Sequence, residues 1–314
     1  MRILYMGTPD FAVLPLEALI SAGEEIIGVV TQADKPQGRG YRLTPPPVKV
    51  CALSHGIPVY QPDTLKGEEF ASLLSELNPE MIVVAAYGKI LPHGVIAYPE
   101  YGCINIHGSL LPEYRGAAPM QRAIIDGKTV TGITVMYMDD GLDTGDMLLK
   151  REVPIGPDDD FGVIHDRMAE CGAKAIVDAV EAIKNGGLDR IPQSSIDSEP
   201  TYAKKIEKSE CLLDFSEAPN ALHNRIRGLS PVPLALTHTP DGRLLKVLKS
   251  ATEEDGEPEQ PGIVVALDGK ITVSCGENGC GRISFLTVLP EGKGKMAAAD
   301  FIRGRKIAVG DRLS

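Results

Sequence analysis

The sequence has no long apolar run, no CxxC pair and no tryptophan, and the first two absences each exclude a class of protein. A membrane-spanning helix needs about 20 consecutive apolar residues, so none is expected. The six cysteines are scattered over 314 residues and favour neither a disulfide framework nor a zinc ribbon. The opening segment MRILYMG leads into an expected strand with no basic region or cleavage site, which predicts a cytoplasmic protein.

Positive charge is also scarce, because 32 Lys and Arg face 43 Asp and Glu for a formal net charge of -11. Taken over the whole chain, this balance argues against a nucleic-acid partner, which needs concentrated Lys and Arg. The charge is unevenly distributed, however: residues 1–200 carry a net charge of -12 and residues 201–314 carry +1. Phosphate contacts depend on patches within a Debye length of about 8 to 10 Å, so the second region can still bind nucleic acid.

The first half alternates short apolar runs with amphipathic stretches, which is typical of βαβ units and a mainly parallel, Rossmann-like sheet. The expected strands are 2–5, 26–31, 81–86, 103–106 and 133–137. The expected helices are 12–22, 48–55, 67–77, 118–126 and 161–185.

The second half has a different texture. A stretch rich in Pro, Ser and charge reads as a linker, and alternating segments separated by Gly and Asp turns follow it. Several short strands at this spacing predict a small β-barrel of the OB-like kind. We therefore expect a catalytic domain over 1–189, a linker over 190–208 and a barrel domain over 209–314.

The start of the chain places a strand, a glycine turn and a helix in the order that dinucleotide-binding folds use. Gly7 is the only glycine of the GxGxxG pattern, since Pro9 and Ala12 occupy the other two positions. The second expected strand also ends without the acidic residue that would hold a ribose. This segment therefore predicts an ordinary open α/β sheet and not a nucleotide cofactor.

The stretch GCINIHGSLLPEYRGAAP is the most informative in the chain. Along a strand, the period-2 rule sends Ile104 and Ile106 to one face and Asn105 with His107 to the other. Both polar side chains precede a Gly-Ser turn at the carboxyl end of a strand, where open parallel sheets bind ligands. The alternative is that they only hydrogen-bond a neighbouring loop, but the position favours a functional pair.

An acidic loop follows about 35 residues later and carries Asp139, Asp140, Asp143 and Asp146. Most of these carboxylates are expected to face water or cap turns, and their spacing does not fit a calcium loop. One of them opposite His107 would orient and stabilise the imidazole. With no Ser or Cys nucleophile upstream, Asn, His and Asp suit transfer to an external nucleophile without a covalent intermediate.

These residues carry a resemblance to the methionyl-tRNA formyltransferases, within the 10-formyltetrahydrofolate-dependent formyltransferase family. The similarity extends from GTPDF to DFIRGRKIAVGD, with NIHGSLLP and GLDTG as its core. It implies that Asn105, His107 and Asp143 are catalytic. It also implies formyl transfer from 10-formyltetrahydrofolate, as co-substrate, to the α-amine of methionyl initiator tRNA, by a cytoplasmic monomer that requires no metal and no membrane.

The resemblance further implies contacts to folate and to tRNA. The folate segment is expected to comprise Ser109, Leu110, Leu111, Pro112, Tyr87, Gly88, Ile90, Leu91, Asp139 and Asp140, largely through backbone groups. The tRNA contacts are expected to comprise Lys35, Arg39 and Arg42 in a basic GRG loop, with Lys204, Lys205, Arg303 and Arg305 in the second domain.

The sequence departs from the family in one place. The common N-P-W-P pattern reads Ser230, Pro231, Val232 and Pro233 here. Two other functions stay open at this point. One is a formyltransferase or formyl-folate hydrolase acting on a small molecule, and the other is a non-enzymatic nucleotide-binding module. The basic loop and the barrel-like region favour tRNA over a small molecule. The incomplete glycine pattern disfavours the nucleotide-binding module, which would also leave Asn105, His107 and Asp143 unexplained.

Overall fold

The computed structural model describes residues 1–37 and 42–314, without the side chains of Gln37 and Arg42. The chain packs as two compact units. Unit 1 comprises 1–116, 130–154 and 165–203, and unit 2 comprises 117–129, 155–164 and 204–314. The two units interleave along the sequence, whereas the domain bounds expected above are continuous segments and stay a prediction.

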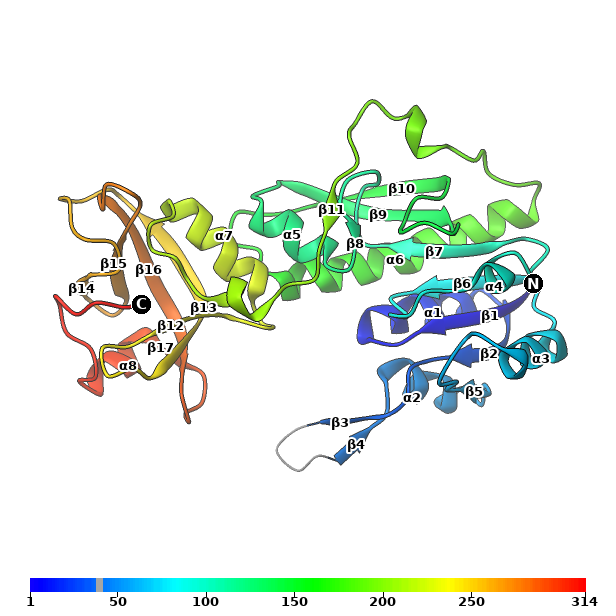
Figure 1. The fold of residues 1–314 in the computed structure, drawn as a ribbon, viewed down its shortest axis with the longest axis horizontal. Coiled ribbons are helices and arrows are strands. Elements are labelled where there is room, and N and C mark those ends of the chain that lie inside the picture. Colours follow the sequence, from blue (N-terminus) through cyan, green and yellow to red (C-terminus); the bar gives the residue numbers. More distant parts are fainter. Residues whose placement is uncertain (38–41) are drawn as a thin grey trace. The chain divides into compact units, whose positions relative to one another are not determined.

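Unit 1 is built on a seven-stranded sheet with the order β10-β9-β7-β6-β1-β2-β5 (Figure 1). The strands are β1 (Arg2–Gly7), β2 (Glu25–Val30), β5 (Val59–Tyr60), β6 (Met81–Ala85), β7 (Cys103–His107), β9 (Val130–Tyr137) and β10 (Met147–Pro154). The pairs from β7 to β5 are parallel, and β9 and β10 are antiparallel. The predicted mainly parallel sheet is therefore confirmed, with an antiparallel hairpin at one edge.

Helices and short strand pairs complete unit 1. The helical segments are η1 (Asp10–Ala12), α1 (Val13–Ser21), α2 (Pro47–Ser54), α3 (Glu68–Leu77), α4 (His93–Ile96), α6 (Phe161–Lys184, whose first turn is counted in unit 2) and η2 (Gln193–Ser195). The short pairs are antiparallel β3 (Lys35–Gln37) with β4 (Arg42–Thr44), and parallel β8 (Arg115–Gly116) with β11 (Tyr202–Ala203).

The sheet of unit 1 is buried because both of its faces are covered. On the face that carries Ile106 and Ile133, a Cβ at Gly172 of α6 would lie 3.2 Å from Ile106 and 3.7 Å from Ile133. On the other face, Phe70 and Leu74 of α3 join a core with Leu4 and Ile82. This double cover explains why β1 and β6 read as continuous apolar runs.

Unit 2 contains an antiparallel sheet with the order β12-β13-β16-β15-β14, to which β17 adds beside β16. The strands are β12 (Ala235–His238), β13 (Leu244–Glu253), β14 (Val264–Leu267), β15 (Ile271–Cys275), β16 (Gly281–Pro290) and β17 (Met296–Ala297). The expected strand-rich antiparallel second domain is confirmed, and the expected OB-like barrel is compatible with it, although the described strands do not close into one. The pairing of these described strands is an open path from β12 to β14.

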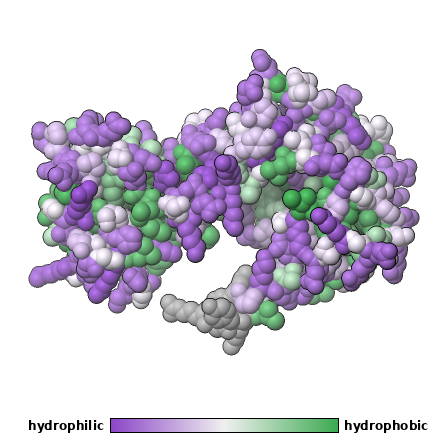
Figure 2. Space-filling model, in the orientation of Figure 1, coloured by the Kyte–Doolittle hydropathy of each residue, from purple (hydrophilic) through white to green (hydrophobic). Residues whose placement is uncertain are grey.

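The helical segments of unit 2 are α5 (Pro119–Ile125), η3 (Lys208–Cys211), α7 (Pro219–Leu229) and α8 (Ala298–Arg303). Close packing of α5 on α7 depends on Gly228, where a Cβ would lie 2.6 Å from the Ile125 side chain. Leu222 and Ile226 of α7 enter the core with Phe285 of β16. Figure 2 shows hydrophilic residues over most of the visible surface, with apolar residues in patches between them. Among the described residues no helix is both long and apolar enough to cross a membrane.

Candidate active site

Strand β7 presents the predicted catalytic pair at its carboxyl end. Asn105 pairs with Val84 of β6 and with Met136 of β9, and His107 pairs with Thr134. Ile106, between them, faces Gly172 of α6, so Asn105 and His107 occupy the opposite face. Asn105 is half-buried, and within the described part of the chain its amide has no side-chain hydrogen-bond partner. Its two N–H donors are therefore available to a ligand.

His107 is held from both sides of its ring. The side chain is 6% exposed, and Nε2 lies 2.9 Å from the backbone oxygen of Tyr114. A carbonyl oxygen only accepts hydrogen bonds, so Nε2 carries a proton and donates it. Nδ1 lies 3.6 Å from Oδ2 of Asp143. The Nδ1 side of the ring therefore faces a carboxylate.

Asp143 lies in the loop between β9 and β10 with a left-handed backbone, at φ 52°. Its Oδ2 accepts a hydrogen bond of 2.8 Å from the backbone N–H of Gly116 in β8. The same oxygen faces His107, so one carboxylate oxygen links the loop, β8 and the imidazole. The structure thus brings His107 and Asp143, 36 positions apart in sequence, into contact.

The other acidic residues of this loop have different partners. Oδ1 of Asp139 accepts hydrogen bonds from the Gly141 N–H, at 3.0 Å, and from the Thr144 hydroxyl, at 2.6 Å. Asp139 thereby shapes the turn, as short acidic side chains often do. Asp140 is exposed and pairs with Nδ1 of His93 at 3.1 Å.

The segment predicted to bind folate after β7 is fixed by internal contacts. The Ser109 hydroxyl donates to the Glu113 backbone oxygen at 2.6 Å. Leu111 is fully buried with Met136 and Met147, Pro112 is buried, and Leu110 is half-buried. The backbone of Leu111 also accepts a hydrogen bond from the Lys150 ammonium. These side chains hold the loop in shape, so any folate contact here would come mainly from its backbone.

The second predicted folate segment follows β6. Leu91 belongs to the core of unit 1, whereas Ile90 is 89% exposed and Gly88 has a positive φ of 81°. The Tyr87 side chain is buried in the same core, and burial raises its pKa to about 12. Its carbonyl oxygen accepts hydrogen bonds from Gln32, at 2.9 Å, and from a threonine of the first loop. The Tyr87 hydroxyl has no partner among the described residues.

The basic residues predicted to contact tRNA lie in both units. In unit 1, Lys35 is exposed and donates to Gln32 at 2.7 Å, the side chain of Arg42 is not described, and Arg39 lies outside the described residues. In unit 2, Lys204, Lys205 and Arg305 are exposed, and exposed Arg303 pairs with Asp300.

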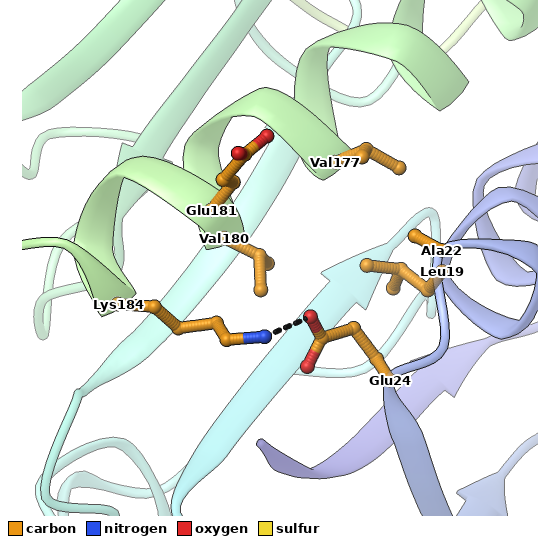
Figure 3. Close-up of a pocket in the computed structure, with 7 residues that line it drawn as sticks. All are labelled: Leu19, Ala22, Glu24, Val177, Val180, Glu181 and Lys184. Carbon is orange, nitrogen blue, oxygen red and sulfur yellow. Dashed lines mark hydrogen bonds and ion pairs between the residues drawn. The ribbon is translucent and has the colours of Figure 1, made fainter.

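Two further clusters of polar side chains lie outside the predicted site. Glu17, Cys51 and His55 are the one group of three possible metal ligands found among the described residues, with donor atoms within 4.8 Å of one another. Burial and then Glu17 raise the pKa of the Cys51 thiol to about 11, so it stays protonated. A pocket between α1 and α6 is lined in part by Glu24, which binds Lys184 at 2.6 Å (Figure 3). No predicted site residue belongs to either cluster.

Sequence reasoning missed four residues that build the site. The Tyr114 carbonyl holds His107, and the Tyr114 N–H donates to the Thr201 hydroxyl at 2.8 Å. Buried Arg115 and buried Gln193 contact each other, and Gln193 also contacts the Asp143 backbone. Gln193 and Thr201 lie in the segment predicted as a linker, where Pro and Ser hide any periodic signal. Only a three-dimensional contact reveals them.

Comparison with known proteins finds relatives that match along the whole chain. The family model "Formyl transferase" matches residues 1–180, and "Formyl transferase, C-terminal domain" matches residues 205–306. A methionyl-tRNA formyltransferase of Geobacter metallireducens is 47% identical, covering 100% of this chain and 98% of that relative. One of Caldanaerobacter subterraneus subsp. tengcongensis is 46% identical, covering 100% of both chains.

A solved structure shares the fold at lower identity. The sugar 3N-formyl transferase WlaRD, crystallised in the presence of dTDP and 5-N-formyl-THF, superposes with a TM-score of 0.66 at 18% identity. It covers 94% of this chain and 99% of its own. Because both family models match, and because the two curated relatives align along their full length, the chain belongs to the formyl transferase family.

Proposed function

We propose that the protein transfers the formyl group of 10-formyltetrahydrofolate to the free α-amino group of methionyl initiator tRNA. The observation that carries this proposal is the full-length identity of 43% to 47% to relatives named methionyl-tRNA formyltransferase. Both the catalytic half and the C-terminal half take part in that similarity. The sugar 3N-formyl transferase WlaRD also covers 94% of this chain, but at 18% identity, so the higher identity favours charged tRNA over a small amine.

The reaction begins with attack of the α-amine on the formyl carbon. An α-amino group titrates at about 7.7 to 8.0, so a good fraction is uncharged at neutral pH and no activated enzyme nucleophile is needed. A carbon–nitrogen bond forms and negative charge develops on the formyl oxygen. We assign the unpartnered N–H donors of Asn105 to this oxygen, since donors aimed at a developing oxyanion are among the largest catalytic effects.

The second requirement is a proton path. The attacking nitrogen loses a proton, and the folate nitrogen gains one when its bond to the formyl carbon breaks. His107 and Asp143 supply the titratable pair beside Asn105, and the Nδ1 side of the ring faces the carboxylate at 3.6 Å. We assign the proton transfer to this pair, with the Tyr114 carbonyl fixing the ring through Nε2.

We place the folate at the carboxyl ends of the parallel strands. Two of the segments predicted to bind folate begin just beyond the carboxyl ends of β6 and β7, and Gly88 and Ile90 are exposed there. This edge is where open α/β sheets bind ligands. The exposed Gly88 backbone supports the predicted contact of the Tyr87–Leu91 segment, together with the Ser109–Pro112 and Asp139–Asp140 segments.

We assign the tRNA to basic side chains outside the catalytic cluster. Lys204, Lys205 and Arg305 are exposed in unit 2, where the sequence loses the negative charge of the first 200 residues. Lys35, Arg39 and Arg42 belong to the loop carrying β3 and β4. Phosphate binding needs such local patches and weakens as salt rises.

The test offers labelled 10-formyltetrahydrofolate to the purified protein with charged initiator tRNA, uncharged initiator tRNA or a nucleotide-linked amino sugar. We expect label only on charged tRNA, released as N-formylmethionine after ester hydrolysis. Uncharged tRNA controls for non-specific binding of the label. Formylation of the amino sugar alone would replace this proposal with a small-molecule formyltransferase.

A further inference from the structure

The Gln193 amide contacts the backbone of the turn that carries Asp143. Its Nε2 donates to the backbone oxygens of Asp143, at 2.8 Å, and of Gly145, at 2.9 Å. Its Oε1 accepts from Nε of Arg115, at 3.0 Å, and from Nη2, at 2.7 Å. Gln193 is 5% exposed and Arg115 is 9% exposed. A buried polar link thus joins η2, β8 and the β9–β10 loop.

The orientation of this amide follows from its neighbours. A guanidinium only donates hydrogen bonds and a backbone carbonyl only accepts them, so the oxygen of Gln193 must face Arg115 and the nitrogen must face the loop. The four contacts use both N–H groups and both lone pairs of the amide. Gln193 therefore has no donor or acceptor left for a substrate, and it acts through the residues it holds.

Through these contacts, Gln193 fixes the position of the Asp143 carboxylate. Asp143 has a left-handed backbone, with φ at 52°. A residue with a Cβ adopts this conformation at a cost in free energy, which contacts with its surroundings must offset. Arg115, the other end of the link, immediately precedes Gly116, whose N–H binds the Asp143 carboxylate. The link thereby ties the Asp143 backbone to the strand that binds the Asp143 side chain.

We propose that Gln193, anchored by Arg115, is a positioning residue that fixes the Asp143 turn so that its carboxylate stays on the Gly116 N–H and beside Nδ1 of His107. This inference rests on the proposed function for its kinetic consequence. Its geometric consequence, loss of the Asp143–Gly116 hydrogen bond when Gln193 changes, does not depend on any substrate.

The kinetic test uses Gln193→Glu, which keeps the shape and the acceptor for Arg115 but turns a carboxylate oxygen toward two carbonyls. A displacement of about 1 Å at a reacting group can cost about 100-fold, so we expect kcat to fall roughly 10- to 100-fold. KM for charged tRNA should stay within about twofold, since Gln193 contacts no substrate. The matched control is Ser194→Ala, an exposed neighbour in η2, which should leave both constants unchanged.

A double-mutant cycle separates positioning from general weakening of the fold. If Gln193 acts through the Asp143 carboxylate, Gln193→Glu should cost less than about twofold in an Asp143→Ala background, measured by single turnover at high enzyme concentration. An equal loss in both backgrounds would mean that Gln193 only supports the structure, and this would overturn the proposal.

Amide exchange provides a readout without substrate. In Gln193→Glu we expect the Gly116 N–H to exchange at least tenfold faster by NMR, because a hydrogen bond that opens more often protects less. The Ser194→Ala control should show wild-type exchange. Unchanged Gly116 protection overturns the positioning role whatever the kinetics. Faster exchange, in a protein that formylates no charged tRNA, would retain the geometric role and refute the proposed function alone.

Discussion

Buried polar side chains are saturated in unit 2 and left partly unpaired in unit 1. In unit 2, buried Arg282 donates to the carbonyls of Gly279, Cys280 and Gly281 at 2.8 to 3.0 Å, and Thr272 bonds Ser284 at 2.8 Å. In unit 1, the side chain of Asn105 has no partner among the described residues, and both orphaned buried hydroxyls, of Thr31 and Tyr87, belong to this unit.

The difference separates polar groups that stabilise the fold from polar groups that are available to a ligand. An unpaired buried polar group costs about 1 to 3 kcal/mol, so a fold retains one where a ligand completes it. In unit 2, the buried polar side chains hydrogen-bond to its own loops and strands. Unit 1 leaves the Asn105 amide without a described partner at the carboxyl end of β7, while Gln193 holds the Asp143 turn and the Tyr114 carbonyl holds His107. We therefore expect substitution of Asn105 in unit 1 to lower activity and not stability, and substitution of a buried polar residue in unit 2 to lower stability and not ligand binding.

The largest expected effect is from Asn105→Ala. Loss of one oxyanion donor lowers kcat by about 10²- to 10³-fold in enzymes of this type of chemistry. Because Asn105 has no partner in the described chain, the free energy of unfolding should not fall. Formylation kinetics and urea denaturation check the two halves of this expectation, with exposed Asn185→Ala as control. A large loss of stability would contradict the contrast between the units.

The opposite signature is expected from Arg282→Ala in unit 2. Three backbone carbonyls, and that of Glu257, lose their donor, so the free energy of unfolding should fall by about 2 to 3 kcal/mol. Binding of a formyl-folate analogue per folded molecule should be unchanged. The control Arg243→Ala removes an exposed pair with Asp241 and should cost less than about 0.5 kcal/mol. Equal losses in both variants would show that burial of Arg282 is not what matters.

A smaller effect is expected from Arg39→Ala, which tests the predicted tRNA loop. Loss of one charge-assisted contact should lower kcat/KM for charged tRNA about tenfold, or about 1.4 kcal/mol. The affinity for a folate analogue, titrated by fluorescence, should stay unchanged. Equal losses for folate and tRNA would place Arg39 in the folate site instead.

The smallest effect concerns the pH dependence of unit 2. Hydrogen bonds from Arg122, at 2.6 and 3.0 Å, and then from the Glu207 N–H hold the Glu210 pKa at about 2. A depressed carboxyl pKa stabilises the fold above the unfolded value of about 4.5, and this contribution is lost as pH falls toward 2. The Glu210 side chain is 32% exposed, so we expect less than about 1 kcal/mol.

Urea denaturation of Glu210→Gln at several pH values measures this contribution. The variant should be less stable than wild type at pH 7, and the gap should close below pH 4.5. Exposed Glu277→Gln is the control and should follow wild type throughout. A gap that does not change with pH would show that the charge of Glu210 contributes nothing.

Sequence patterns predicted the strands and helices better than the side-chain contacts of the candidate site. Apolar runs marked β1, β6 and β7 because both faces of that sheet are buried. The edge strand β10 was missed, since its exposed Lys150, Arg151 and Glu152 interrupt the pattern. His107 and Asp143 were predicted as partners from the resemblance and from strand alternation. Gln193 was not, because one buried amide in a Pro- and Ser-rich segment leaves no periodic signal. The roles of the site residues stay predictions.

The most direct test of the account is the single-turnover rate of formyl transfer in Asp143→Asn with both substrates bound. This change removes only the charge, since the new side chain still offers an oxygen to the Gly116 N–H. We predict a fall of at least about 100-fold, with folate binding and the free energy of unfolding unchanged. A rate near that of the wild type would contradict the assignment of chemistry to the His107–Asp143 pair.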